Sequence, residues 1–252
     1  MRVEAVAHRA VSAPSMALVL GIVLSASNAS ALSVQGDLGA RGWFLSADGT
    51  ANGTDLAALG FDDAKGAPEF RGDLVLGERH HLGASYLRIR RDESAVATAT
   101  ILGVLRFNDP VSLDLSVDDV RFHYGYGFRV HHWLEVQPFL EIAYLRGDVT
   151  TTETLLGQTS HEEDSIVLPM PGLEVVIAPA FPIHLKGRAE GMGVGRGHLL
   201  DVQGGAEAAY AFFFGGFGYR YADLEVNEKG SSGGDLADLR LKGLYVEGGL
   251  RF

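Results

Sequence analysis

The chain has 252 residues, of which 46% are hydrophobic and 21% are charged, and its formal net charge is −11 at neutral pH. This composition is too apolar for a disordered chain. The absence of cysteine excludes disulfide scaffolds and any zinc or iron–sulfur site that cysteine would ligate. The acidic balance argues against a nucleic-acid partner, because binding to a phosphate backbone requires a basic surface.

The first 31 residues have the pattern of a cleaved secretory signal peptide. Arg2 and Arg9 give a weakly basic start, an apolar run follows at 16–24, and the small residues Ala29 and Ala31 precede the predicted cleavage site. This run is too short for a transmembrane helix, which needs about 20 residues. We therefore predict cleavage after residue 31, and residues 32–252 form the mature domain.

The rest of the chain alternates apolar and polar residues. In one segment Val120, Phe122 and Tyr124 oppose Arg121 and His123. The same period of two recurs in four other segments, at 134–144, 183–190, 200–210 and 244–252. Successive side chains of a β-strand point to opposite faces, so each segment has one apolar and one polar face.

Ten strands are predicted, and turn-forming residues separate them. We place them at 33–47, 68–79, 82–91, 114–129, 133–147, 165–178, 183–196, 199–212, 216–226 and 238–252. The connections are short turns that alternate with mostly long, acidic or glycine-rich loops at 48–67, 92–113, 148–164 and 227–237. The predicted fold is an all-β, closed, up-and-down antiparallel transmembrane β-barrel, with short periplasmic turns and long extracellular loops. Eight or twelve strands remain alternatives.

A soluble β-sandwich with one wet face would show the same alternation. The polar faces here are rich in charge, as a wall around a polar lumen requires. Aromatic residues also gather at the segment ends, among them Trp43, Phe44, Trp133, Tyr144, Tyr219 and Tyr221. Because such aromatic girdles lie at membrane interfaces, these features favour the membrane barrel.

The long segment at 92–113 is predicted to extend the barrel as an extracellular hairpin. Residues 97–107 would pair with residues 111–117, and 108–110 (Asn-Asp-Pro) would form the turn. Residues 54–60 are expected to form one capped helical turn within the first long loop.

Two irregularities interrupt the alternation. The apolar parity changes between Val117 and Val120, which indicates either a bulge or the point where the strand leaves the membrane. Pro169 and Pro171 lie inside the sixth strand, where a proline removes a hydrogen bond from the ladder. Either a bulge absorbs these prolines or the strand begins only at Leu173.

The signal peptide, the alternating strands and the final Leu250-Arg251-Phe252 resemble the OmpA-like family of bacterial outer-membrane β-barrels. The resemblance implies residence in the outer membrane, contact with its lipid and lipopolysaccharide, and insertion by the barrel-assembly machinery. It further implies an assembly signal in the last strand, made of Leu244, Val246, Leu250 and Phe252. A monomer is expected, because a single small barrel needs no partner. The architecture hosts porins, enzymes, adhesins and structural proteins, so it does not define a function.

The polar faces place charges of both signs in the predicted lumen. The lumenal set is Arg121, His123, Glu135, Glu141, Lys186, Arg188, Glu190, Asp201, Glu207, Arg220, Glu247 and Arg251. Such charges must pair, since an isolated buried ion is costly. Because side chains normally fill the interior of a barrel of about eight to ten strands, we favour a structural salt-bridge core. A narrow passive pore for small solutes is the alternative.

No catalytic residue, cofactor or metal site is predicted. The run from His161 to Ser165 combines a base, three acids and a hydroxyl, but a solvated acidic loop is the favoured interpretation. The histidine pairs at 80–81 and 131–132 fall in predicted periplasmic turns, and adjacent strand residues point to opposite faces. The favoured function is a structural or surface-interaction role, and a lipid-modifying or proteolytic barrel enzyme is the second alternative.

Overall fold

The computed structural model describes residues 33–51, 54–55, 57, 61–101, 105–153, 158–180, 183–194, 197–227 and 235–252. The predicted signal peptide lies outside these residues. The barrel strands are β1 (Val34–Ala51), β3 (Lys65–Leu76), β4 (His80–Ile101), β5 (Leu105–Tyr126), β7 (Leu134–Glu153), β8 (Gln158–Ala180), β9 (Ile183–Val194), β10 (Gly197–Tyr210), β11 (Phe213–Asn227) and β12 (Asp235–Arg251). Two short strands, β2 (Thr54–Asp55) and β6 (Phe128–His131), pair with β1 and β7.

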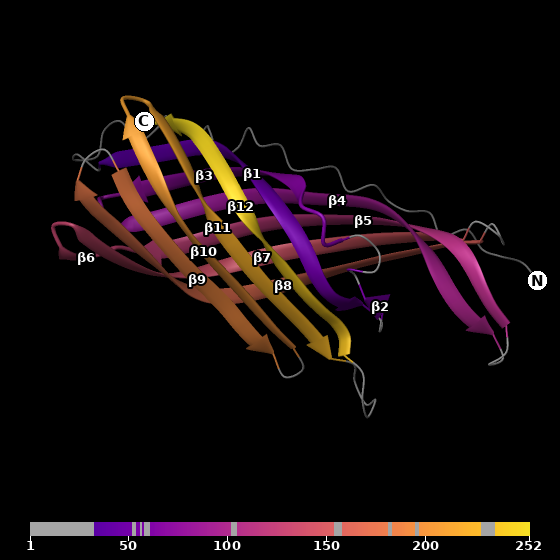
Figure 1. Cartoon of the computed structure of the whole chain (residues 1–252). Helices are drawn as coiled ribbons and strands as arrows, with labels where there is room; N and C mark the ends of the chain where they lie inside the picture. The colour runs from indigo at the N-terminus through magenta and orange to yellow at the C-terminus, as the bar shows by residue number, and fades with distance from the viewer. Residues whose placement is uncertain are drawn as a thin grey trace, which may run out of the picture. The chain divides into compact units, whose positions relative to one another are not determined.

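The ten long strands form a closed antiparallel barrel (Figure 1). Each pairs with its neighbour along the chain, and β12 pairs with β1 from Asp37↔Arg251 to Ala51↔Ala237. The prediction of ten strands in an up-and-down barrel is therefore confirmed, and eight or twelve is wrong. The part of the chain that the structure describes contains no helix long and apolar enough to cross a bilayer.

The first residues of β1 and the last residues of β12 lie at the end of the barrel that has the short turns. Gly77 and Glu78, with φ of 60° and 66°, lie in the turn between β3 and β4. Positive φ at successive residues matches the twist of the flanking strands. In outer-membrane barrels this end faces the periplasm, so we call it the periplasmic end and the opposite one the extracellular end.

A band of exposed apolar side chains surrounds the barrel. It includes Leu38, Phe44, Phe70, Phe122, Leu140, Ile142, Leu185, Val202, Phe217, Leu244, Val246 and Leu250, all at least 39% exposed. A contiguous apolar surface of this kind does not face water in a soluble protein. It is the lipid-facing wall of a membrane barrel, and the soluble sandwich is therefore rejected.

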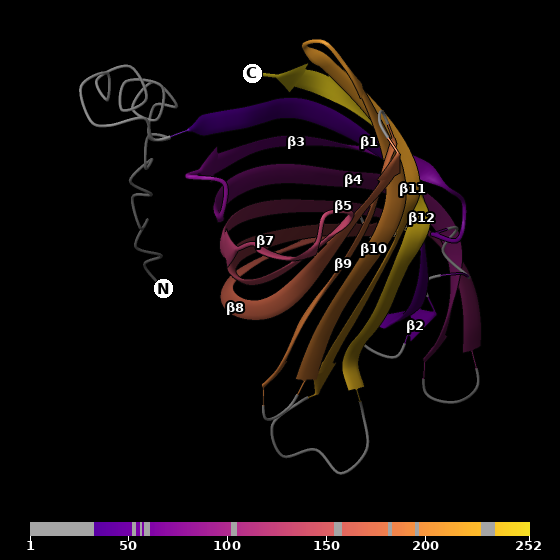
Figure 2. The same cartoon turned by 90° about the vertical axis from the view of Figure 1, so that its left-hand side faces the viewer.

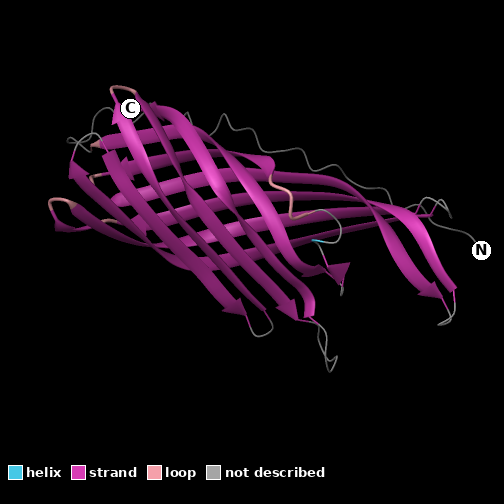
Figure 3. Ribbon diagram, viewed as in Figure 1, coloured by secondary structure: helices cyan, strands magenta, loops and turns pink. Residues whose placement is uncertain are grey.

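Four neighbouring strands are much longer than a bilayer requires. β4, β5, β7 and β8 have 22, 22, 20 and 23 residues, whereas about 9–11 residues span the membrane. They extend together beyond the other strands (Figure 3). Much of the predicted loops at 92–113 and 148–164 is therefore strand.

The predicted extracellular hairpin is present, but its turn is wrongly placed. The last pair between β4 and β5 is Ile101↔Leu105, so residues 108–110 lie inside β5. Pro110 is tolerated there because β5 pairs with β7 only up to Val111↔Glu153. Beyond that pair β5 is an edge strand, where a missing N–H costs no ladder bond.

Towards the extracellular end the barrel divides into two sheets. The ladder between β3 and β4 stops at Glu69↔Leu87, and the ladder between β8 and β9 stops at Gly172↔Glu190. Beyond these pairs β4, β5, β7 and β8 form one sheet, and β9 to β12 with β1 and β3 form the other. Figure 2 shows the two groups of strands diverging. We call this two-sheet region the collar.

Prolines stand where both ladders stop. Pro68 precedes Glu69, and Pro171 precedes Gly172. A proline has no N–H to offer a neighbouring strand, so it fits where pairing ends. The register between β7 and β8 runs through Pro169 and Pro171 without a shift. No bulge absorbs these prolines, and the strand does not begin at Leu173, so both explanations are wrong.

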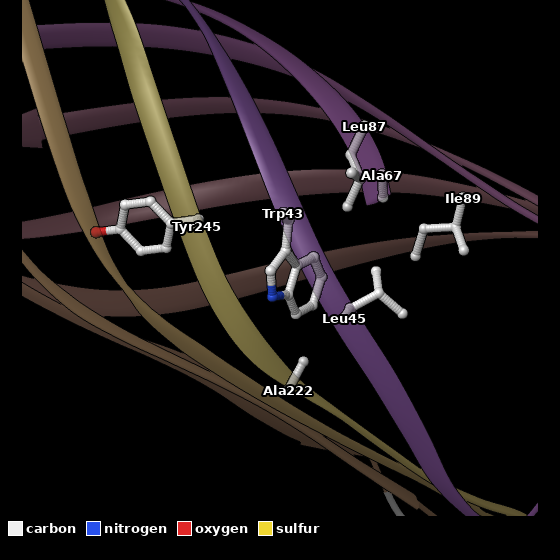
Figure 4. Packing of buried hydrophobic residues seen from close by; sticks show 7 residues of the cluster. All are labelled: Trp43, Leu45, Ala67, Leu87, Ile89, Ala222 and Tyr245. Atoms are coloured by element: carbon white, nitrogen blue, oxygen red, sulfur yellow. The ribbon is translucent and has the colours of Figure 1, made fainter. Parts of the chain in front are cut away.

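Apolar side chains fill the space between the two sheets of the collar. Trp43, Leu45, Ala67, Ala222 and Tyr245 of one sheet pack with Leu87 and Ile89 of the other (Figure 4). A second cluster joins Ala143, Leu168 and Met170 to Leu199, and a third contains Ala47 and Phe61. We call these three clusters the extracellular core. Trp43, only 1% exposed, belongs to this core, so its assignment to an aromatic girdle was wrong.

The first loop contributes to this core. Thr54 and Asp55 form β2 against the end of β1, so the predicted helical turn is wrong at these two residues; much of 56–60 lies outside the described residues. The backbone N–H of Ala47 donates to the carbonyl of Phe61 at 2.9 Å. This bond places Phe61, 1% exposed, within the barrel mouth.

Along β7 the apolar side chains move from the outer face to the inner face. On β7 Glu141 is buried inside and Ile142 is 50% exposed outside. Further along, Leu145 packs against the core and the side chain of Arg146 is 49% exposed. The registers of β5 with β4 and β7 have no shift here, so the change of parity at Val117 is not a bulge. It marks the point where the strand leaves the lipid.

Candidate functional site

The lumen below the extracellular core holds one connected network of ion pairs. Ten residues of the predicted lumenal set belong to it: Arg121, Glu141, Lys186, Arg188, Glu190, Asp201, Glu207, Arg220, Glu247 and Arg251. The other two, His123 and Glu135, lie at its periplasmic edge. The alternation of the strands is what turns these side chains inward.

Arg121 is the hub of the network. Its guanidinium nitrogens lie 2.7 Å from Asp119, 3.2 Å from Glu141, 2.7 Å from Glu190 and 2.9 Å from Asp201. All five side chains are at most 11% exposed. The planar guanidinium offers several donors, and it can therefore satisfy carboxylates from four different strands.

Two further arginines supply the positive charge that this cluster of carboxylates needs. Arg220 donates to Asp201 at 2.6 Å and to Glu69 at 3.3 Å. Arg188 donates to Glu190 at 2.8 Å and also pairs with Glu141. Because buried ions are tolerated only when paired and hydrogen-bonded, the cluster is stable as a unit.

The other half of the network surrounds two carboxylates on β10 and β12. Glu207 accepts from Lys186 and Arg251, each at 2.7 Å. Glu247 accepts from Arg41 at 2.9 Å and lies 3.3 Å from Arg71. The network thereby reaches around the whole interior.

Several members were missed from the sequence: Asp37, Arg41, Glu69, Arg71, Asp119 and Gln203. The signal for most of them was present. On β3, Glu69 and Arg71 alternate with Phe70, Gly72 and Leu74, in the same period of two as the other strands.

Aromatic rings cover the extracellular side of the network. The guanidinium of Arg41 lies 4.1 Å from the ring centre of Tyr245, and that of Arg220 lies 4.7 Å from Trp43. Each guanidinium therefore has carboxylates on one side and a ring of the extracellular core on the other. Cation–π contacts of this kind stabilise a charge that has left water.

A cavity of about 360 Å³ lies on the periplasmic side of the network. Residues at the periplasmic ends of the strands line it, among them Gln35, Val75, His81, Glu135, Val176 and His184. His123 enters it from β5, with Nε2 at 3.5 Å from Asp73. From the periplasm inward, the lumen thus has three layers: a polar cavity, the ion network and the extracellular core.

The histidines singled out from the sequence are dispersed. His161 is in β8 and not in a loop, with Nδ1 at 3.4 Å from Asp148 and 3.2 Å from the hydroxyl of Thr150. His80 pairs with the hydroxyl of Tyr124 at 2.9 Å. The rings of His131 and His132 lie 4.2 Å apart at the periplasmic end.

Three residues of the predicted assembly signal share the outer face of β12, and Phe252 follows directly after the strand. Leu244, Val246, Leu250 and Phe252 are 63%, 53%, 50% and 57% exposed. Phe252 also exchanges two backbone hydrogen bonds with Gly36, at 2.8 and 2.9 Å. The last strand is thus fixed in the closing seam, while its recognition by assembly machinery stays a prediction.

No family model and no curated protein matches this chain. Solved structures match it at low identity. The outer membrane protease OmpT of Escherichia coli has a TM-score of 0.49 and 7% identity, over 89% of this chain and 99% of OmpT. The translocator domain of the autotransporter NalP of Neisseria meningitidis has a TM-score of 0.48 and 14% identity, over 94% of each chain. The attachment invasion locus protein Ail of Yersinia pestis has a TM-score of 0.40 and 10% identity, over 86% of this chain and 99% of Ail.

These neighbours share a barrel architecture with this chain, and architecture carries no activity with it. The lipid-facing band, the closed sheet and the charged lumen are features of the chain itself. The protein is an integral membrane β-barrel of the outer-membrane type.

Proposed function

We propose that this protein is a closed, non-conducting barrel that holds the outer part of a rigid two-sheet collar outside the membrane for contact with other surface molecules, without catalysis of its own. The observation that carries the proposal is the extracellular core. It fills the lumen just where a pore would have to open.

The energetics favour the closed state. Leu45, Leu87 and Ile89 are at most 7% exposed, and burial of each such side chain stabilises the fold by about 1.5–3 kcal/mol. A conducting state would have to wet these side chains and separate the ion network beneath them. Separation of a buried pair costs about 3–5 kcal/mol.

The collar supports a role in surface contact. Its long strands continue the membrane wall as regular sheet, so the outer face is rigid. Beyond the lipid-facing band, its outer face carries charged side chains, among them Arg88, Asp114, Arg146, His161 and Glu163. Side chains held on strands are placed more firmly than side chains on loops, and contact surfaces benefit from that preorganisation.

Contacts with membrane lipid and lipopolysaccharide follow from the same proposal. The exposed apolar band supports the first, and cationic side chains next to it, such as Arg88 and Lys242, support the second. We also propose that the outer face of β12 carries the assembly signal. Its four residues are exposed in the folded barrel.

Tryptophan fluorescence tests the closed lumen. The chain has two tryptophans, and Trp133 is 41% exposed at the periplasmic end. The Trp133→Phe variant therefore leaves Trp43 as the single fluorophore. We expect blue-shifted emission from the refolded variant and almost no quenching by iodide. Strong quenching of Trp43 would show that water and ions reach the core, and the proposal would fail.

A further inference from the structure

Three potential metal ligands meet on the outer face of the collar. Asp148 of β7 lies directly opposite Glu163 of β8, and Thr150 lies opposite His161. His161 and Glu163 are two residues apart on β8, so both point to the same face as Asp148. The arrangement is therefore set by the strand register and not by a flexible loop.

The ligand atoms of the three residues converge. One atom each from Asp148, His161 and Glu163 lies within 4.8 Å of the other two. Nδ1 of His161 is 3.4 Å from Asp148 Oδ1. The side chains are 38%, 55% and 46% exposed, so solvent and ions reach them.

Two carboxylates of like charge face each other at this place. Asp148 and Glu163 are like charges directly opposite each other, which destabilises a strand pair. Arg146 relieves part of this repulsion, because its Nη2 lies 2.8 Å from Glu163 Oε1. Asp114 of β5 adds a further carboxylate nearby, because it is the direct partner of Thr150, which lies opposite His161. The local excess of carboxylates therefore persists.

We propose that Asp148, His161 and Glu163 bind a divalent transition-metal ion at the cell surface. One imidazole nitrogen with two carboxylate oxygens is a donor set for Zn²⁺, with water at the remaining position. Calcium is disfavoured, because it takes oxygen ligands in larger number. The site lies outside the lumen, so it does not depend on whether the barrel is closed.

The test is a titration of the full chain, refolded in detergent without a histidine tag, with zinc chloride in a calorimeter. We expect one site, and a loss of affinity of more than about tenfold in His161→Ala and in Asp148→Asn. Absorbance of bound Co²⁺ in the visible range gives a second readout, which reports the ligands directly.

His198 provides a matched control. It is also exposed and has two acidic neighbours, but Glu225 lies 3.2 Å from Nδ1 and Asp223 lies 3.8 Å from Nε2. Ligands on opposite ring nitrogens cannot hold one ion together. His198→Ala should therefore bind Zn²⁺ as the wild type does.

Arg146→Gln tests Glu163 as a ligand. The substitution removes the guanidinium that competes for the carboxylate, so we expect tighter binding. The proposal is overturned if the wild type shows no single site, if His161→Ala binds as well as the wild type, or if His198→Ala loses the site instead. Unchanged affinity in Arg146→Gln would remove Glu163 from the ligand set and leave too few ligands for this site.

Discussion

Asp201 lies between two arginines in the centre of the barrel. Its carboxylate accepts from Arg121 at 2.9 Å and from Arg220 at 2.6 Å, and its side chain is 2% exposed. The residue lies between two buried guanidinium groups that would otherwise repel each other. Its contribution is therefore larger than that of an ion pair on the surface.

We expect Asp201→Ala to destabilise the barrel by about 3–5 kcal/mol, because it leaves two buried positive charges without a shared partner. Urea unfolding of the refolded variant in detergent micelles measures the change. Glu225→Gln, which alters an ion pair at the exposed rim, is the control and should change stability by less than about 1 kcal/mol. Equal effects of the two substitutions would contradict a tightly buried network.

Arg91 closes the gap that opens between β3 and β4. It is 1% exposed, and it donates to the carbonyl of Leu45 at 2.6 Å and to that of Asp63 at 2.8 Å. Its guanidinium also lies 6.0 Å from the ring centre of Phe61. The side chain thereby replaces backbone bonds that the interrupted ladder does not make.

Arg91→Leu should release the first loop from the barrel mouth. The loss of two charged hydrogen bonds is expected to cost about 3 kcal/mol or more. Limited proteolysis of intact cells or vesicles measures the release as new cleavage within residues 52–64. A variant as resistant as the wild type would show that Phe61 and not Arg91 retains the loop.

At the scale of the strands, the sequence predicted the existence of each element well and its length poorly. The period of two continues from the membrane into the collar, but the apolar residues move to the other face. Leu145 and Arg146 look like the end of a lipid-facing strand, because the outer position is charged. In a strand that passes from lipid into water, the apolar side chains must change from the outer face to the inner face. In the sequence this change interrupts the alternation of apolar and polar residues, so the pattern indicates the end of a strand there.

A like-charged pair marks the outer face of the collar. Asp92 and Asp114 are direct partners across β4 and β5. Partial desolvation and the carboxylates of Asp92 and Asp148 raise the pKa of Asp114. A raised pKa means that the folded protein binds this proton more tightly than the unfolded chain does, so stability is lost as the pH rises through that pKa.

Asp114→Asn should therefore stabilise the protein at neutral pH, by about 0.5 kcal/mol. The gain should vanish at a pH of about 3, where the carboxyl is protonated in both states. Unfolding curves of the wild type and the variant at the two pH values measure this gain in stability. Asp118→Asn is the control with the opposite sign, because Asp118 lies 3.5 Å from Arg88 and the neutral amide gives up that attraction. A gain that persists at low pH would contradict the electrostatic explanation.

At the scale of the molecule, the charged lumen was predictable and its pairing was not. The alternation identified inward charges on β5, β7, β9, β10, β11 and β12, but the partners depend on how the sheet closes. Arg41 meets Gln203 across 162 positions of the chain. Nothing local to either residue indicates that contact. The extracellular core was missed for the same reason, since it forms only where two distant groups of strands face each other.

Single-channel recording from the refolded protein in a planar bilayer tests the closed barrel most directly. Insertion is verified first by the heat-dependent gel mobility of a folded barrel. Because the ion network and the extracellular core fill the lumen, we expect no conductance steps at any applied voltage. Reproducible conductance steps would contradict this account, because they require water to pass both the ion network and the extracellular core.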